Sequence, residues 1–168
     1  MQCYPRLSAS EIWAIVPEDP YRGVLEEAAS SLQPVMDELG TGAEAWGLIH
    51  ADLHLENVVF ANGQARPIDF DDCGFGYWLY DIAVALWELR LHDHWSALYQ
   101  AFLDGYAQHR PVPHDQLLYL DAFIAAREAT IGLAMAAMTH DVPEYRVYLD
   151  EDMRNAAETI RAIVGKGS

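Results

Sequence analysis

The chain has 168 residues, of which 52% are hydrophobic, so it can bury the core of one globular domain and is not a disordered chain. Its formal net charge of −16, from 26 acidic against 10 basic residues, argues against a nucleic-acid partner, because phosphates need a basic patch. Two cysteines are too few for a disulfide framework, and the N-terminal stretch lacks the apolar run of a signal peptide. We therefore expect a cytoplasmic protein that is not inserted in a membrane.

The N-terminal part is predicted to be an irregular lead-in at residues 1–21, because several prolines interrupt it. Apolar residues then recur at helical spacing through 22–39. Gly40 is expected to end this helix, because glycine tolerates the left-handed conformation that follows many helices. The helix and its connector together span residues 22–46.

The next segment, GLIHADLHLENVVF at residues 47–60, permits two interpretations. His50, Asp52 and His54 alternate, so on a strand they would share one face and form a zinc-type site of a metal-dependent hydrolase. On a loop, the same residues would instead present Asp52 as a proton acceptor and, five residues on, Asn57 as a polar ligand. The loop interpretation is preferred, because the strand interpretation leaves Asn57 without a role.

A β-hairpin is predicted directly after Asn57. Asn62-Gly63 is the strongest short hairpin signal, since both residues accept a positive φ, and the returning strand is expected at 65–70. Counting outwards from the turn sets Asn57 opposite Ile68 or Asp69. An amide oxygen and a carboxylate would then meet at one point, and such hard oxygen ligands suit Mg²⁺. The loop and hairpin segment spans residues 47–78.

The rest of the chain, residues 79–168, is predicted to be a helical subdomain. The fold class is therefore α+β and mostly α, a single domain over 1–168 with helices around a small hairpin, rather than alternating βαβ units. The predicted helices are 79–91, 95–108, 115–138 and about 143–164.

Three motifs in order resemble the aminoglycoside phosphotransferase and choline kinase superfamily, whose members have a protein-kinase-like fold. The resemblance covers about residues 22–140. One departure is Ala51, where family members often have glycine. The motifs are His50-Ala-Asp52 with Asn57, then Ile68-Asp69-Phe70-Asp71, then Tyr80-Asp81-Ile82-Ala83.

The resemblance implies transfer of the ATP γ-phosphoryl group to a small-molecule hydroxyl, with ATP and Mg²⁺ as cofactors. It implies that Asp52 is the catalytic base and that Asn57 and Asp69 bind magnesium. Asp71 is either a supporting group of the metal site or a turn former. Three residues are implied to support the catalytic loop, namely His50, Phe70 and Asp81.

Substrate-binding residues are less defined by the sequence. An amine-bearing substrate suits the acidic charge, although that charge is also explained by solubility. Phe75, Tyr77 and Trp78 either line a cation-binding pocket through their ring faces or belong to the core. Arg127 is expected to be buried and paired. The candidate substrate-binding residues are Asp72, Trp78, Asp121 and Glu128, of which the last two share a helix face at a spacing of seven.

Two parts of a complete kinase cleft are missing from this sequence. No G-x-G-x-x-G occurs, and the one lysine, Lys166, lies in the tail. The chain is therefore interpreted as a carboxy-terminal lobe without its nucleotide lobe, weak or inactive in isolation. Its inter-lobe face is expected to be apolar and to bind a second copy or a separate N-terminal lobe. The alternative function is a non-catalytic remnant or binding module that pairs with another chain.

Overall fold

The computed structural model describes residues 14, 16 and 21–164. The chain folds as two compact units, one formed by residues up to Val35 and from Ala125 onward, the other by Met36–Ile124. The predicted catalytic loop and hairpin both fall in the second unit. The predicted lead-in lies almost wholly outside the described residues, as does Lys166. The single-domain expectation stays a prediction.

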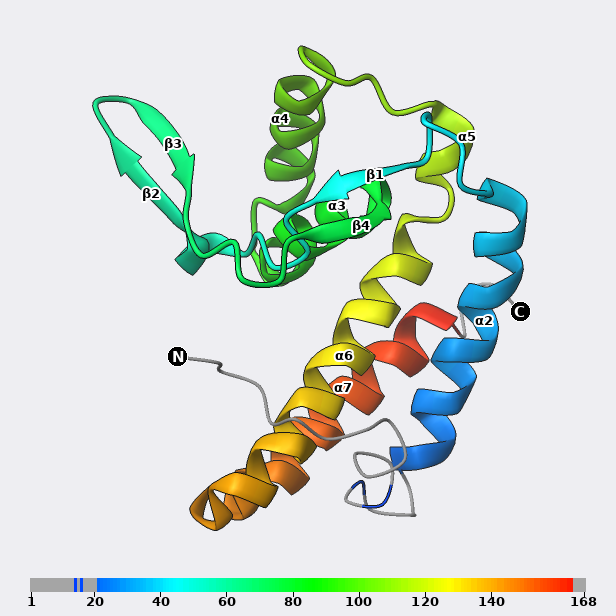
Figure 1. Ribbon diagram of the computed structural model, residues 1–168, viewed down its shortest axis with the longest axis vertical. Coiled ribbons are helices and arrows are strands. Elements are labelled where there is room, and N and C mark those ends of the chain that lie inside the picture. The colour runs from blue at the N-terminus through cyan, green and yellow to red at the C-terminus, as the bar shows by residue number, and fades with distance from the viewer. Residues whose placement is uncertain (1–13, 15, 17–20, 165–168) are drawn as a thin grey trace. The chain divides into compact units, whose positions relative to one another are not determined.

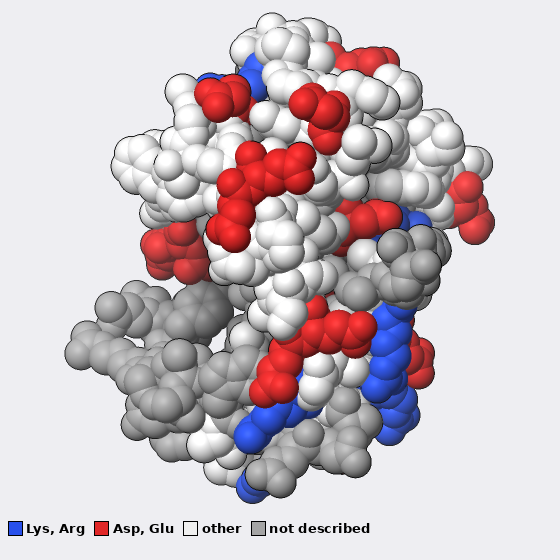
Figure 2. Space-filling view, turned by 90° about the vertical axis from the view of Figure 1, so that its right-hand side faces the viewer, with Lys and Arg blue, Asp and Glu red and all other residues white. Residues whose placement is uncertain are grey.

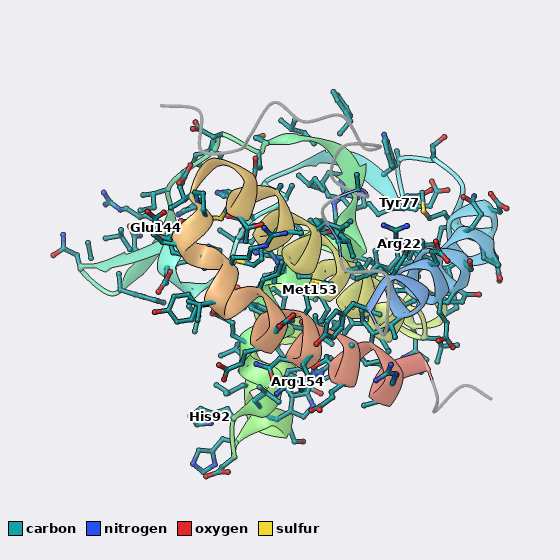
Figure 3. The ribbon with its side chains drawn as sticks, turned by 90° about the horizontal axis from the view of Figure 1, so that it is seen from below. Arg22, Tyr77, His92, Glu144, Met153 and Arg154 are labelled. Atoms are coloured by element: carbon teal, nitrogen blue, oxygen red, sulfur yellow. The ribbon has the colours of Figure 1, made fainter. Side chains whose placement is uncertain are left out.

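The first unit is helical. It holds most of α2 (Gly23–Leu39), most of α6 (Leu120–Asp141) and all of α7 (Arg146–Val164). Met153 of α7 is 1% exposed, and a Cβ added at Gly132 of α6 would lie only 3.2 Å from its sulfur (Figure 3). A residue without a side chain therefore lets α6 and α7 pack closely around a buried methionine. A short 3-10 turn, η4 (Pro143–Tyr145), leads into α7.

The second unit contains two small antiparallel sheets (Figure 1). β1 (Trp46–Ile49) pairs with β4 (Gly74–Tyr77), and β2 (Val58–Ala61) forms a hairpin with β3 (Gln64–Pro67). Asn62 and Gly63 both have a positive φ, 53° and 73°, so the Asn-Gly turn forms as its composition predicts.

Helices cover the rest of this unit, and α3 (Trp78–Trp87) is its core helix. A 3-10 segment, η3 (Glu88–Leu91), joins α3 to α4 (Trp95–Ala107), and α5 (His114–Leu117) precedes α6. The buried residues of α3 recur at helical spacing, and the ones that the sequence predicts are Leu79, Ile82, Ala83 and Leu86, each at most 2% exposed.

Three elements differ from the sequence predictions. The expected helix at 115–138 is wrong, because the chain breaks at Leu118 and Tyr119, where the backbone makes i→i−3 bonds before α6 begins. No glycine or proline marks that break. The returning strand ends at Pro67 instead of continuing to residue 70. β4 was not predicted, since its two glycines obscure the strand pattern.

The apolar part of α6 also satisfies a test for membrane spans. Leu120–Thr139 is long and apolar enough to cross a bilayer by length and composition alone. Half of that window is buried within the fold, and it carries the buried carboxylate Glu128. Core helices pass the same test, so the segment is weak evidence for a membrane span.

Candidate active site

The candidate site begins with a backbone turn held by one carboxylate. Asp81, in the first turn of α3, accepts the backbone N–H of His50 at 2.9 Å on Oδ2 and that of Ala51 at 2.7 Å on Oδ1. Ala51 has a φ of 67°, which an alanine adopts at a cost of about 1–2 kcal/mol. Two charge-assisted hydrogen bonds therefore hold a strained turn directly after β1.

His50 joins this turn to the end of the hairpin. Its side chain is 6% exposed, Nε2 lies 3.0 Å from the carbonyl oxygen of Ile68, and its ring packs on Phe70 with centroids 4.6 Å apart. Because a carbonyl can only accept, Nε2 carries the proton. Nδ1 is buried and has no hydrogen-bond partner among the described residues.

Asn57 ends the 3-10 turn η2 (Leu55–Asn57) and is 9% exposed. Its side-chain nitrogen donates to the backbone oxygen of Asp52 at 2.9 Å and to Asp52 Oδ2 at 3.1 Å, and lies 3.2 Å from His54 Nε2. The NH₂ group therefore faces acceptors, which leaves Oδ1 on the opposite side of the amide.

The hairpin sets Asn57 opposite Ile68, the residue that precedes Asp69. In this hairpin, Phe60 pairs with Ala65, and Val58 pairs with Pro67. The same register continues to Asn57, whose backbone carbonyl accepts the N–H of Ile68 at 2.9 Å. The register therefore follows the count from the turn.

Asp69 itself is exposed and has a φ of 61°. Among the described residues, only Ala51, Asn62 and Asp69 have a positive φ without being glycine, and two of these three flank the candidate site. Such strain is typical of functional positions. Asp71 and Asp72, which follow, are both exposed.

Of the aromatic residues predicted near the substrate, Phe75, Tyr77 and Trp78, two make their contacts with other parts of this chain. Trp78 Nε1 donates to the carbonyl of Ala43 at 3.2 Å, and the Arg110 guanidinium lies 3.9 Å from the Trp78 ring centroid. Arg110 also donates to the Ala43 carbonyl, at 3.1 Å. No pattern near Trp78 in the sequence points to this arginine, because it lies far along the chain. Trp78 as a substrate residue stays a prediction.

Tyr77, which belongs to the same cluster, is a core residue. Its hydroxyl donates to the Met36 carbonyl at 3.2 Å, and its ring packs edge-on against Trp46 and beside Phe123. Phe75, by contrast, is 75% exposed.

The two acidic candidates on α6 belong to different units. Asp121 lies in the second unit and lines a pocket of about 250 Å³ together with Trp95 and Tyr99, whose rings are 5.2 Å apart. Glu128 lies in the first unit and is 9% exposed. The structure therefore gives Asp121 an aromatic neighbourhood that suits an amine, and both residues remain predictions as substrate ligands.

One tyrosine near the loop is electrostatically perturbed. Burial, and next the negative charge of Asp81, raise the pKa of Tyr106 above its usual value, while Arg110 acts in the opposite direction. The Asp81 carboxylate therefore acts on more than the two backbone groups that it binds.

The zinc-type interpretation of the loop is not supported. Residues 50–54 form no strand, and His50 faces Ile68 whereas His54 faces Asp52. Within the described part of the chain, no group of three or more His, Cys, Asp or Glu side chains is arranged to hold a metal ion.

Acidic side chains elsewhere do not form one patch. Figure 2 shows them scattered over the face that it presents. His92, which follows η3, is exposed and projects outwards in Figure 3. On that face, acidic residues are dispersed in the way that solubility favours.

The fold and this loop–hairpin arrangement define the class of protein as a kinase-like phosphotransferase. A family model described as "Phosphotransferase enzyme family" matches residues 6–115, and the chain belongs to that family.

Curated relatives match over part of their length. The chain is 34% identical over 74 residues to amicoumacin kinase of Bacillus subtilis (strain 168), covering 44% of this chain and 21% of that protein. It is 34% identical over 94 residues to homoserine kinase of Neisseria meningitidis serogroup B, covering 54% and 30%. The chain thus spans less than a third of either relative.

Solved structures match over most of this chain. An amicoumacin kinase in complex with AMP-PNP, Ca²⁺ and Ami has a TM-score of 0.69 at 21% identity, covering 88% of this chain and 47% of that one. A microcompartment-associated aminopropanol kinase has a TM-score of 0.63 at 27% identity, covering 84% and 42%. The fold is therefore the one seen in about half of each kinase, as expected of a mostly helical α+β lobe.

Proposed function

We propose that this chain is the catalytic lobe of a phosphotransferase that moves the γ-phosphoryl group of ATP to a hydroxyl of an amine-bearing small molecule, with Mg²⁺. One observation carries the proposal. Asp52 follows the Asp81-held turn and accepts a hydrogen bond from Asn57, and the hairpin register pairs Asn57 with Ile68, the residue that precedes Asp69. Membership of the phosphotransferase family and similarity to kinases support the same reaction.

Each residue has one task in this reaction. The substrate oxygen attacks the γ-phosphorus, the bond from that phosphorus to the bridging oxygen breaks, ADP leaves, and an Asp52 carboxylate oxygen accepts the hydroxyl proton. The Asn57 amide oxygen and the Asp69 carboxylate are oxygen donors of the kind that Mg²⁺ prefers, so the donor set fits the metal. When bound, magnesium neutralises charge on the phosphate oxygens.

An amine on the substrate is supported by a second observation. The pocket at Asp121 combines a carboxylate with the rings of Trp95 and Tyr99, which are the groups that attract an organic cation. One similar structure is named as an aminopropanol kinase, and aminopropanol is an amino alcohol.

The test is calorimetric titration of the chain with ATP and Mg²⁺, repeated with Asp69→Ala and with Asp93→Ala. Asp93 is a matched control, because it is an exposed aspartate outside the site. Binding in the chain and in Asp93→Ala that is lost in Asp69→Ala supports the proposal. Binding that survives Asp69→Ala contradicts the assigned metal site.

We propose that turnover by this chain alone is weak. A strand lysine and a glycine-rich cover, neither present in the sequence, would each supply charge-assisted hydrogen bonds to the phosphates, worth about 1.5–3 kcal/mol per bond. Purified chain that phosphorylates an amino alcohol at rates ordinary for a kinase contradicts this.

A binding role is the second candidate, and an exposed apolar surface favours it. Leu48 and Phe75 face each other across β1 and β4 and are 60% and 75% exposed, and Phe70 is 54% exposed. We propose that a nucleotide-binding lobe covers these residues, whether it lies on the same polypeptide or on another one. Mass measurement in solution tests this, and a dimer dissociated by Phe75→Glu would assign the surface to a second copy.

A further inference from the structure

The amide of Asn57 has more acceptors than hydrogens. Its NH₂ group carries two hydrogens and faces the Asp52 carbonyl oxygen at 2.9 Å, Asp52 Oδ2 at 3.1 Å and His54 Nε2 at 3.2 Å. The shortest contact takes one hydrogen. The second hydrogen is therefore shared between the Asp52 carboxylate and the His54 ring.

His54 can accept this second Asn57 hydrogen in only one of its two neutral tautomers. Its Nε2 must be unprotonated to accept from Asn57, so the proton lies on Nδ1. The same Nε2 is 3.5 Å from Asp52 Oδ2, and the two side chains are similarly enclosed, with 19% and 17% exposed. In this tautomer His54 does not donate to the carboxylate, and it competes with that carboxylate for the Asn57 hydrogen.

We propose that His54 is a positioning residue of the catalytic loop, whose Nε2 accepts the Asn57 amide hydrogen. The contact has one consequence, which rests on the function proposed above. It keeps the Asn57 NH₂ group turned inwards, so that Oδ1 is directed to the metal.

The first test needs no variant and no metal. Nitrogen-15 NMR of the histidine rings, at a mildly alkaline pH where free imidazole is neutral, reports which nitrogen carries the proton. We expect an unprotonated Nε2 and a protonated Nδ1 for His54. A His54 ring with the proton on Nε2 would overturn the inference, because that nitrogen could not accept from Asn57.

The second test compares His54→Leu, which removes the acceptor, with His54→Gln, whose side-chain oxygen restores one. His109→Leu is the matched control, since His109 is exposed after α4 and outside the loop. The readout is the affinity for Mn²⁺ in the presence of ATP. Loss of a group that orients a metal ligand weakens metal binding by about 10–100-fold, so we expect at least tenfold weakening in His54→Leu and recovery to within about threefold in His54→Gln.

The outcomes separate this inference from the proposed function. If the unchanged chain binds Mn²⁺ and His54→Leu binds it equally well, the positioning role is wrong while the function stands. If the unchanged chain has no Mn²⁺ site, the proposed function fails, and the ring tautomer alone decides whether His54 holds Asn57. Equal losses in His54→Leu and His54→Gln would also overturn the role, because an acceptor at this position would then make no difference.

Discussion

Replacing Ala51 by glycine should stabilise this protein, although alanine-to-glycine changes usually destabilise. Ala51 has a φ of 67°, and the left-handed conformation costs an L-residue about 1–2 kcal/mol. Glycine removes that strain but gives the unfolded chain more freedom, which costs about 0.4–1 kcal/mol. The difference is a net gain of about 0.8 kcal/mol.

Urea unfolding measures this gain. With a slope of about 2 kcal/mol per molar urea, 0.8 kcal/mol raises the midpoint by about 0.4 M without changing the slope. The control is Ala101→Gly, an exposed position inside α4, where glycine should lower stability by about 0.5–1 kcal/mol. If Ala51→Gly lowers the midpoint as Ala101→Gly does, the turn is not strained in the way described.

Three further perturbations have defined outcomes. Asp81→Asn retains one acceptor oxygen and loses the other, so unfolding free energy by urea titration should fall by about 1.5–3 kcal/mol. Gly47→Ala places a Cβ against the Trp78 ring and should destabilise by about 1–3 kcal/mol in thermal unfolding. Gly74→Ala should cost less, because its Cβ would make only an ordinary contact with the Asp72 carbonyl oxygen at 3.8 Å. Tyr106 has a raised pKa when folded, so its contribution to stability is present below the unfolded pKa and is lost as pH rises through the folded value. The free energy of unfolding of the unchanged chain should therefore fall more steeply at alkaline pH than that of Tyr106→Phe.

The hairpin shows what a sequence can predict. Asn62-Gly63 determines the turn chemistry locally, and once the turn is placed, the antiparallel register follows by counting, as far as the contact of Asn57 with Ile68. The helix 22–39 and its left-handed end at Gly40 are confirmed for the same reason, since apolar spacing and a glycine signal are both local.

The elements that were missed depend on partners far away in the chain. β4 is a strand because β1 pairs with it, and a Cβ at Gly76 would press against the Ile49 side chain of β1. Arg110 contacts both Trp78 and Ala43, and it lies 67 residues after Ala43 in the sequence. Neither contact leaves a pattern within a short window of sequence, so local propensity and spacing could not reveal them.

The same distinction applies within the candidate site. The family resemblance implies that Asp52, Asn57 and Asp69 act in phosphoryl transfer, but their spacing does not show which end of the Asn57 amide would face a metal ion. That orientation follows from three acceptors, one of which belongs to His54, a residue that the sequence first assigned to a zinc-type alternative. The hydrogen-bond census around a side chain therefore supplied a role that residue spacing could not.

Preorganisation of the loop separates metal binding from turnover. The groups that hold Asp52 and Asn57 are Asp81, His54 and the Ile68 backbone, and all lie within the unit Met36–Ile124. None of these contacts requires a phosphate cover or a strand lysine. We therefore expect the chain to retain an ordered loop and a divalent-metal site even where catalysis is weak. Contacts within this unit determine the geometry around Asp52, whereas charge stabilisation of the phosphates depends on the phosphate cover and the strand lysine.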